Sequence, residues 1–367
     1  MSGVKCTNKP KPDVSPEALG YTKREWDRIN AIDAKEQRRQ IRLFLILALL
    51  LAVVIFMLVM VYQVVWRSHD YQLVLPYGSS RVLLEGRNIS EMELAPSFAK
   101  DLAVTDGDVN TDMLNIGALS AGLFDLTSNR VVYGKDLFAT RSPASMTKIM
   151  TAIVALKYGN LDDIVVITDT ALKVEYGSSV CDVRVGDRLS LKQLLYGMIV
   201  ASGNDAAMMV AEHVGGSVEH FVEMMNDEAR QLGATRTHFS NPHGLTDSEH
   251  YTCVYDLYLI FREGMKYDLF MDMISRSNFY AEYTAGDETG RAVTWETTNH
   301  YFTGEAPLPE TMIVYGGKTG TTEDAGACLI LLAKDLYGNP FLGVIMHSED
   351  KDVLYLDMNG LLALATT

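Results

Sequence analysis

The longest apolar run of the chain precedes its globular part. Residues 43–66 read LFLILALLLAVVIFMLVMVYQVVW, and Gln63 is their only strongly polar member. About 20 apolar helical residues suffice to cross a bilayer, so this run is long enough to span one with some tilt. The pattern predicts one transmembrane helix, residues 43–66.

Two other structures could contain such an apolar run. A buried core helix is rarely apolar over so many consecutive residues. A cleaved signal peptide has an apolar region of roughly 7–15 residues followed by a small-residue cleavage site. Here an arm of 42 residues precedes the run, and the following VYQVVWRSHDY offers no such site. We therefore expect an uncleaved membrane anchor.

Beyond the apolar run the pattern changes from weak to regular. Residues 67–112 are polar and acid-leaning without strong periodicity, which predicts an extracytoplasmic stalk packed loosely or not at all. In the domain that we expect over residues 113–367, the segments IGALSAGLFDL and RVVYGKD follow the pattern of strands. The turn-forming residues 127–129 between them predict a hairpin.

Apolar residues at helical spacing dominate the middle of the chain. The segment RSPASMTKIMTAIVAL predicts a helix that Ser142 caps and whose first turn contains Pro143. Further helices are expected for LKQLLYGMIVA, capped by Ser190, and for DAAMMVAEHV and VEHFVEMMNDEARQL, which end near glycines. Residues 251–275 add one more helical stretch.

Strand patterns return near the end of the chain. TMIVYGGKTGTT, GACLILLAKD and NPFLGVIMHS predict three strands, and DVLYLDMNGLLALA predicts a final amphipathic helix. Strands therefore occur at both ends of the domain, with a long helical part between them. This order predicts an α/β domain built from both ends of residues 113–367, with an all-α subdomain inserted between them.

Charge divides the chain in the same place as the apolar run. The net charge of −15 leaves no basic patch to neutralise phosphates, which argues against nucleic acid as a partner. Residues 25–42 carry five Lys or Arg, whereas residues 67–84 carry two. By the positive-inside rule we expect residues 1–42 to form a cytoplasmic tail and the acidic remainder to lie outside, as in a single-pass protein of the cell membrane.

Ser-x-x-Lys occurs four times, beginning at Ser2, Ser97, Ser145 and Ser348, so the motif carries no weight by itself. The third copy differs because it lies in an apolar helix. Residues three apart on a helix share a face with Cβ atoms about 5–6 Å apart, so Lys148 can reach the Ser145 hydroxyl. Burial lowers the pKa of a lysine toward the neutral amine, a general base that can activate a serine. A buried lysine paired with an acid elsewhere is the structural alternative.

Two further motifs each occur once. Ser-Gly-Asn at 202–204 interrupts two apolar helices, and such a break lets polar side chains face a cleft; a simple helix cap is the alternative. Lys-Thr-Gly at 318–320 follows an apolar strand and is preceded by two glycines. Glycines allow a ligand to approach a strand closely, and a strand edge can bind a peptide-like substrate. A strand end with one surface lysine is the alternative here.

Taken together, the three motifs resemble the signature of penicillin-binding proteins and class A β-lactamases. Ser202 follows Ser145 by 57 residues, and Lys318 follows Asn204 by 114. With NPHGL and the preceding FVEMMNDEARQLGATRTHF, the chain is identified as a member of the serine-type D-alanyl-D-alanine carboxypeptidases (peptidase S11), the low-molecular-mass penicillin-binding proteins. The resemblance covers roughly residues 113–367. It implies a β-lactamase/transpeptidase-like fold with an antiparallel sheet flanked by helices, an α+β form of the α/β class.

The resemblance also implies roles for the motif residues. Ser145 would attack the carbonyl between the two D-alanines of a peptidoglycan stem peptide, Lys148 would take its proton, and Ser202 would relay a proton to the leaving amine. Backbone N–H groups of Ser145 and Thr321 would form the oxyanion hole. β-Lactams would inhibit covalently, and neither a metal nor an organic cofactor is required. The implied substrate-binding residues are Asn204, Lys318, Thr319 and Thr321, the last at a position where some members carry histidine.

Three other functions share parts of this pattern. A β-lactamase needs a base for deacylation, commonly a glutamate after the helical region, but residues 231–246 contain no acid. A transpeptidase would pass the acyl group to an amine instead of water. A non-catalytic membrane-anchored scaffold would bind peptidoglycan without needing all of the motif residues, which are intact here. We therefore expect a penicillin-sensitive carboxypeptidase.

Overall fold

The computed structural model describes residues 101–366 continuously and, before them, residues 22–24, 39, 42–46, 49–51, 53, 55 and 57. The chain divides into two units, Met1–Met92 and Glu93–Thr367. In the first unit the described residues from 42 to 57 are helical. Among the described residues, no helix has both the length and the apolar character that crossing a bilayer requires. Much of the predicted span 43–66, and the predicted stalk from 67 to 100, lie outside the described residues.

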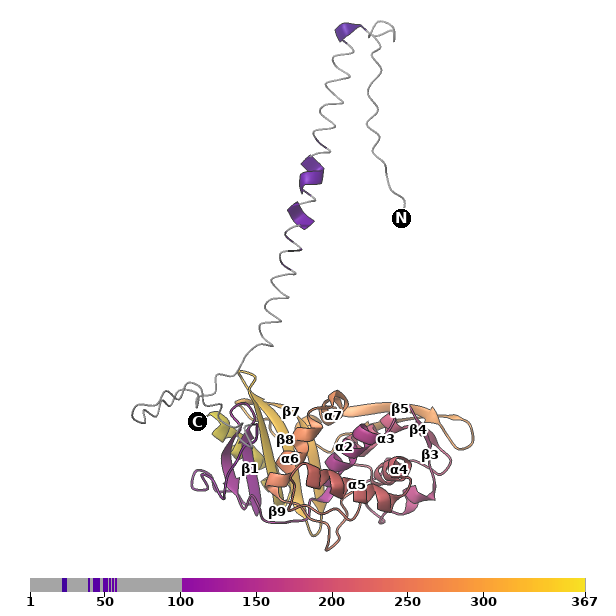
Figure 1. Ribbon diagram of the computed structural model, residues 1–367, viewed down its shortest axis with the longest axis vertical. Coiled ribbons are helices and arrows are strands. Elements are labelled where there is room, and N and C mark those ends of the chain that lie inside the picture. The colour runs from indigo at the N-terminus through magenta and orange to yellow at the C-terminus, as the bar shows by residue number, and fades with distance from the viewer. Residues whose placement is uncertain are drawn as a thin grey trace, which may run out of the picture. The chain divides into compact units, whose positions relative to one another are not determined.

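The second unit contains a five-stranded antiparallel sheet built from both ends of the predicted domain (Figure 1). Its strand order is β2-β1-β9-β8-β7. β1 joins the two ends, because it pairs with β2 on one side and with β9 on the other, where Ala121 lies opposite Ile345. The predicted hairpin and the three late strands are confirmed. The strands are β1 (Ser120–Asp125), β2 (Arg130–Lys135), β7 (Met312–Thr322), β8 (Gly326–Asp335) and β9 (Pro340–Ser348).

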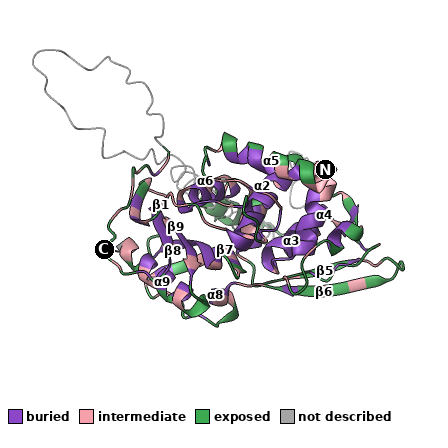
Figure 2. Cartoon of the chain, turned by 90° about the horizontal axis from the view of Figure 1, so that it is seen from below, coloured by how far each residue is buried: buried purple, intermediate pink, exposed green. Residues whose placement is uncertain are grey.

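Successive side chains of a strand point to opposite faces of the sheet, and in this sheet both faces are apolar and each is covered by a helix. α9 (Lys351–Ala363) packs on one face in a cluster that includes Leu123. α6 (Val254–Gly264) covers the other face, where Phe124 stacks on Tyr258 with ring centroids 4.3 Å apart. Figure 2 shows the resulting buried layers on both sides of the strands. The predicted closing helix is thus confirmed as α9.

A group of helices fills the middle of the chain, and α2 (Lys148–Tyr158) lies at its centre. Figures 1 and 2 show α3 and α4 on the side of α2 away from the five-stranded sheet, and α5 alongside α2. The predicted Ser190 cap is confirmed, since Ser190 and Gln193 form a reciprocal capping box. The single stretch expected within residues 251–275 is two helices, α6 and α7. The remaining helices are α3 (Leu191–Val200), α4 (Asn204–Gly215), α5 (Val218–Gln231), α7 (Asp268–Ile274) and the short α8 (His300–Thr303).

The inserted region is not all-α, and that prediction was wrong. A second antiparallel sheet with the order β3-β4-β5-β6 accompanies its helices. Two of its strands have three residues, too few to show a period of two, and the outer strand β6 exposes most of its residues. The domain is therefore α+β with two antiparallel sheets. The added strands are β3 (Ile164–Val166), β4 (Arg188–Ser190), β5 (Asn278–Thr284) and β6 (Gly290–Glu296).

The end of the predicted stalk packs against the domain. Ala103 is fully buried, and its N–H donates to the Tyr258 hydroxyl at 2.8 Å. The Tyr255 hydroxyl donates to the Ala103 carbonyl, also at 2.8 Å, and Val109 forms a bridge with Gly134 of β2. Backbone hydrogen bonds hold these residues, and such bonds do not depend on a regular spacing of apolar side chains. The hydrophobic pattern of residues 101–112 therefore did not indicate that they pack against the domain.

The helix that carries Ser145 begins differently from the prediction. Its first turn is a 3₁₀ helix, η2 (Ala144–Thr147), and Pro143 occupies the N-cap position without any side-chain cap. Ser142 does not cap, and its hydroxyl is buried without a hydrogen-bond partner. The physical reason is the conformation of Ala144, whose φ of 46° is left-handed and does not occur in a regular helix start.

Candidate active site

Lys148 lies at the centre of the three motifs. Its Nζ donates to Ser145 Oγ at 2.8 Å, to Asn204 Oδ1 at 2.7 Å and to the His243 carbonyl at 2.8 Å. None of these partners is a carboxylate, so the structural alternative of a paired buried acid does not describe this lysine. The predicted i, i+3 contact between Ser145 and Lys148 is therefore present.

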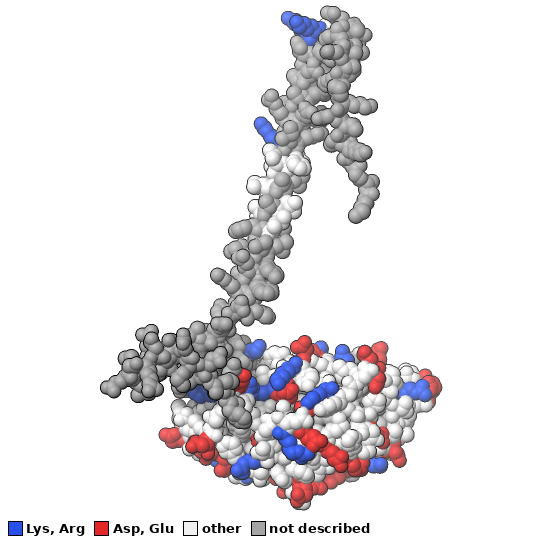
Figure 3. Space-filling model, viewed as in Figure 1, with Lys and Arg blue, Asp and Glu red and all other residues white. Residues whose placement is uncertain are grey.

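Burial controls the charge of Lys148. The side chain is completely buried, whereas basic and acidic side chains intersperse over the visible surface in Figure 3. Desolvation is the main cause that lowers the pKa of Lys148 well below its usual value, and the nearby charge of Lys318 lowers it further. Asp205 acts in the opposite direction. In the neutral amine, two N–H groups remain for the Asn204 and His243 oxygens, and the lone pair can accept the hydroxyl proton of Ser145.

The break between α3 and α4 presents Ser202 and Asn204 to this lysine. Ser202 has a φ of 60°, and a Cβ on Gly203 would lie 2.2 Å from Cys181 Sγ, so the glycine allows the loop to lie close to that thiol. Asn204 N donates to the Ser179 carbonyl at 2.8 Å. The predicted helix break is confirmed, and neither Ser202 nor Asn204 acts as a side-chain cap of α4.

Asp205, the residue after the Ser-Gly-Asn motif, holds residues 181–183 in place. Its carboxylate accepts the N–H groups of Cys181 at 2.8 Å and of Val183 at 3.3 Å. Burial raises the pKa of Asp205, while these backbone donors oppose the rise. The bonds tie residues 181–183 to the first turn of α4 and so support the loop that carries Asn204.

Lys318 connects the second and third motifs. Its Nζ donates to Ser202 Oγ at 3.0 Å and to the Thr319 carbonyl at 2.9 Å. The side chain is 1% exposed, and burial lowers its pKa to about 7. The alternative of a surface lysine at a strand end is thus excluded. Thr319 lies beside it, half-buried, and its hydroxyl bonds to that of Thr298.

β7 brings the third motif against the start of the Ser145 turn. It is an edge strand of the five-stranded sheet, so one row of its backbone groups points away from β8. A Cβ on Gly320 would lie 2.9 Å from Ser145 N and 3.0 Å from the Pro143 carbonyl, which leaves room only for glycine. Thr321 follows directly and is exposed. Gly320, near the end of β7, is therefore in close contact with the backbone of the Ser145 turn.

Three contributors to this site had no signal in the sequence. The His243 carbonyl binds Lys148 through the backbone, and Gly244 approaches so closely that a Cβ there would lie 1.9 Å from the Ala144 carbonyl. Both residues belong to the segment NPHGL, which supports the family resemblance but does not by itself predict this contact. Thr298, the partner of Thr319, lies in an ordinary polar sequence and had no distinguishing pattern.

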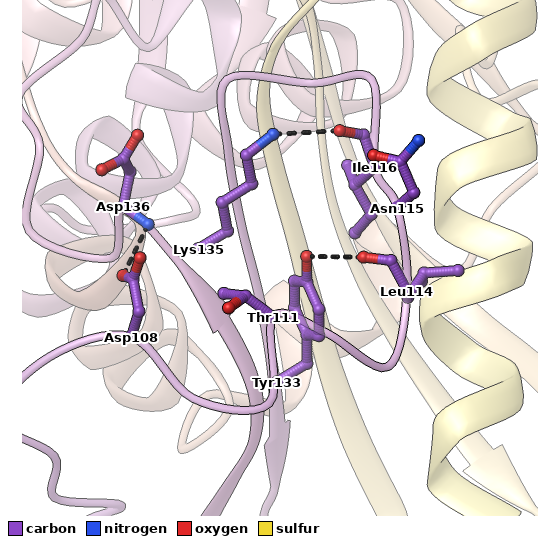
Figure 4. Close-up of a pocket in the computed structure, with 8 residues that line it drawn as sticks. All are labelled: Asp108, Thr111, Leu114, Asn115, Ile116, Tyr133, Lys135 and Asp136. Atoms are coloured by element: carbon purple, nitrogen blue, oxygen red, sulfur yellow. Dashed lines mark hydrogen bonds between the residues drawn. The ribbon is translucent and has the colours of Figure 1, made fainter.

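A separate pocket of about 260 Å³ lies at the opposite edge of the sheet, next to β2 (Figure 4). Two of its polar side chains already bond to backbone carbonyls of the same pocket. The Tyr133 hydroxyl donates to the Leu114 carbonyl, and Lys135 Nζ donates to the Ile116 carbonyl. β2 and β7 are the two edges of this sheet, so the pocket is not part of the Lys148 site.

Metal-ligand clusters are absent from the part of the chain that the structure describes. No group of three or more His, Cys, Asp or Glu side chains is placed there to hold a metal ion. The described cysteines, Cys181, Cys253 and Cys328, are free and buried. Burial raises the pKa of each of these thiols, so they are protonated at neutral pH.

Comparison with known proteins agrees with this geometry. The family model for D-alanyl-D-alanine carboxypeptidase matches residues 107–349. The D-alanyl-D-alanine carboxypeptidase DacF of Bacillus subtilis is 33% identical over 250 residues, which cover 66% of this chain and 60% of that protein. DacD of Escherichia coli is 34% identical over 222 residues, 58% of this chain and 54% of that one. The chain thus spans between about half and three fifths of the length of these relatives.

Solved structures with the same fold include the DD-transpeptidase of Streptomyces K15. It is 28% identical with a TM-score of 0.64, and the match covers 69% of this chain and 98% of that one. A putative penicillin-binding protein homologue of Mycobacterium tuberculosis gives 27% identity and a TM-score of 0.61 over 71% of this chain and 95% of that one. Since the family match covers more than half of the sequence and the three motifs converge on Lys148, the chain belongs to the D-alanyl-D-alanine carboxypeptidase family, peptidase S11.

Proposed function

We propose that the protein is a serine-type D-Ala-D-Ala carboxypeptidase, which removes the terminal D-alanine of peptidoglycan stem peptides through an acyl-enzyme at Ser145. The observation that carries this proposal is the 2.8 Å contact between Lys148 Nζ and Ser145 Oγ, made by a lysine whose burial favours the neutral amine. The contact joins a nucleophile to a base. The same site would form a long-lived adduct with penicillin.

Acylation follows from these contacts. Lys148 accepts the Ser145 proton while Ser145 Oγ attacks the carbonyl carbon between the two D-alanines. In this proposal the backbone N–H groups of Ser145 and Thr321 stabilise the oxyanion that forms, and the close approach of Gly320, the residue before Thr321, to Ser145 N supports this assignment. Ser202, hydrogen-bonded to Lys318, relays a proton to the departing D-alanine amine, and the C–N bond breaks. Water then attacks the ester, and Ser145 recovers its proton as the shortened peptide leaves.

Substrate binding uses the donors that remain. Asn204 Oδ1 accepts a bond from Lys148, which leaves its Nδ2 free to donate to the substrate amide carbonyl. Lys318, with the hydroxyls of Thr319 and Thr321, binds the terminal carboxylate. The backbone of the edge strand β7 pairs with the peptide as an added strand.

The charge of Lys318 predicts a pH dependence of substrate binding. Burial lowers its pKa to about 7, so the ammonium is present below pH 7 and is lost above it. We expect KM for a D-Ala-D-Ala peptide to rise by about fivefold from pH 7 to pH 8, as the charged fraction falls. The turnover number kcat should change little, because a bound carboxylate stabilises the ammonium. A peptide amidated at its C-terminus is the control, and an equal rise in its KM would contradict the assignment of Lys318.

The function is tested with a labelled penicillin and a D-Ala-D-Ala peptide on the full-length protein. We expect an adduct of one penicillin per chain, a long adduct lifetime, and free D-alanine from the peptide, all absent in Ser145→Ala. Absence of an adduct in the unsubstituted protein would exclude the enzyme. Rapid release of hydrolysed penicillin would indicate a β-lactamase, and transfer of the peptide to an added amine in place of D-alanine hydrolysis would indicate a transpeptidase.

We also propose that residues 43–66 anchor the enzyme in the cell membrane with residues 1–42 in the cytoplasm. Support comes from the length of the apolar run and from the five Lys or Arg within residues 25–42. This orientation would bring the catalytic domain to the outer face, where peptidoglycan lies.

A further inference from the structure

A buried histidine links the loop around residue 240 to the turn that carries Ser145. The His250 side chain is 1% exposed, and its Nε2 lies 2.7 Å from Thr147 Oγ1. Its Nδ1 lies 3.0 Å from Ser240 N. A backbone N–H can only donate, so Nδ1 must accept this bond, and the proton of the neutral ring is on Nε2. Nε2 therefore donates to Thr147 Oγ1.

Thr147 connects His250 to Ala144, the residue before the nucleophile Ser145. Its Oγ1 donates to the Ala144 carbonyl at 2.8 Å, while accepting from His250. Ala144 is held at a φ of 46°, an unfavourable conformation for a residue with a Cβ, and such conformations persist only where the surroundings enforce them. The bonds run in one direction, from Ser240 N–H through His250 and Thr147 to the Ala144 carbonyl.

We propose that His250 is a positioning residue for acylation, which in its neutral form, with the proton on Nε2, fixes the turn from which Ser145 attacks. The proposal rests on the acyl-enzyme function proposed above and adds a residue to it. His250 does not touch the substrate; it acts through Thr147 and Ala144. Protonation of the ring turns Nδ1 into a donor that faces the Ser240 N–H, so the bond that fixes the ring against residue 240 is lost, although Ser240 Oγ lies 3.3 Å from Nδ1 and Nε2 still carries its proton.

The surroundings of His250 keep it neutral at ordinary pH. Burial is the largest cause that lowers its pKa, to about 4. His238 and Lys148 lower this pKa further, Asp247 raises it, and the ring of Phe239 meets the imidazole edge to face. An unfolded histidine has a pKa of about 6.5. The stabilisation from the neutral ring is therefore complete above about pH 6.5 and is lost as the pH falls through about 4.

The test measures the dissociation constant of the non-covalent penicillin complex and the acylation rate constant separately, on full-length protein. We expect His250→Phe and Thr147→Val to lower the acylation rate constant by roughly 10–100-fold, because a misplaced nucleophile slows attack. The dissociation constant should stay within about twofold, since no ligand contact changes. His250→Gln, which keeps a donor near the Nε2 position, and Thr147→Ser, which keeps the hydroxyl, should each restore most of the rate.

Thr151 provides a matched control on the same helix. Its buried hydroxyl donates to the Pro242 carbonyl at 2.6 Å, so it ties α2 to the same loop but not to Ala144. Thr151→Val should lower the melting temperature as Thr147→Val does, without changing the acylation rate constant of the folded protein. If His250→Phe, Thr147→Val and Thr151→Val all lower the acylation rate constant by comparable factors, His250 has only a structural role.

The pH profile gives a readout that a structural role would not change. Because glutamine does not titrate, the acylation rate constant of His250→Gln relative to that of the unsubstituted protein should rise as the pH falls through about 4. A constant ratio would overturn the proposal. The two proposals also fail differently: no adduct in the unsubstituted protein removes the enzyme function, whereas equal acylation of it and of His250→Phe removes only the positioning role.

Discussion

Lys148→Met is expected to lower the rate of penicillin acylation by roughly 10³–10⁴-fold, near the upper limit for loss of one general base. Methionine fills a similar volume but accepts no proton from Ser145. It also leaves the Asn204 and His243 oxygens, which now accept from Lys148 Nζ, without that donor. The rate is measured from the mass of the adduct against time, at protein concentrations where circular dichroism shows a folded chain.

Lys157→Met is the matched control for this substitution, because Lys157 lies on the same helix α2 far from Ser145. Its Nζ bonds to Glu228 at 2.7 Å, and Glu228 is almost fully buried. Losing this partner leaves a buried carboxylate unpaired, so the melting temperature should fall while the acylation rate is unchanged. Acylation of Lys148→Met at the rate of the Lys157→Met control would show that Lys148 is not the base.

Gly320→Ala is expected to lower acylation by about 100-fold through displacement of β7 from the nucleophile. The added methyl group would lie 2.9 Å from Ser145 N and 3.0 Å from the Pro143 carbonyl, so backbone on one side has to move. That movement separates the two N–H groups that we propose for the oxyanion. The measurement is again the acylation rate constant, combined with the melting temperature.

Gly290→Ala controls for a methyl group added to a strand glycine. Nothing lies within 4 Å of a Cβ at Gly290, which begins β6 at the surface. This variant should be acylated at the rate of the unsubstituted protein. If Gly320→Ala also keeps that rate, the close approach of β7 to Ser145 is not needed for the reaction.

The sequence predicted the elements in which the spacing of the apolar residues can be recognised. β1, β2 and the three late strands were found because they combine six or more residues with several buried apolar positions. β5 and β6 were missed although each has seven residues, because most of their positions are exposed or half-buried. β3 and β4 were missed because three residues show no period. The start of the Ser145 helix was mispredicted because Ser142 and Pro143 satisfy local capping rules, whereas contacts with Gly244 and Thr147 enforce the left-handed Ala144.

The motif residues were predictable as a set because this chemistry requires particular residue types at particular spacings along the sequence. Lys148 had one expected partner in Ser145, and the structure adds Asn204 and the carbonyl of His243. A backbone carbonyl has no residue signature, so that third partner could not be predicted. The roles assigned to Ser202, Lys318 and Thr321 remain predictions, and the pH dependence of KM tests that of Lys318.

The position of β1 between β2 and β9 has a consequence for how the enzyme matures. Ala121 pairs with Ile345, so more than 200 residues of sequence separate two neighbouring positions of the central sheet. Contacts of such long range form slowly, because the intervening chain loses entropy when its ends meet. β7, β8 and β9 follow the other strands of the sheet along the chain and leave the ribosome after them, and β7 reaches Ser145 only as part of this group. A growing chain therefore stays catalytically silent until these three strands have been made.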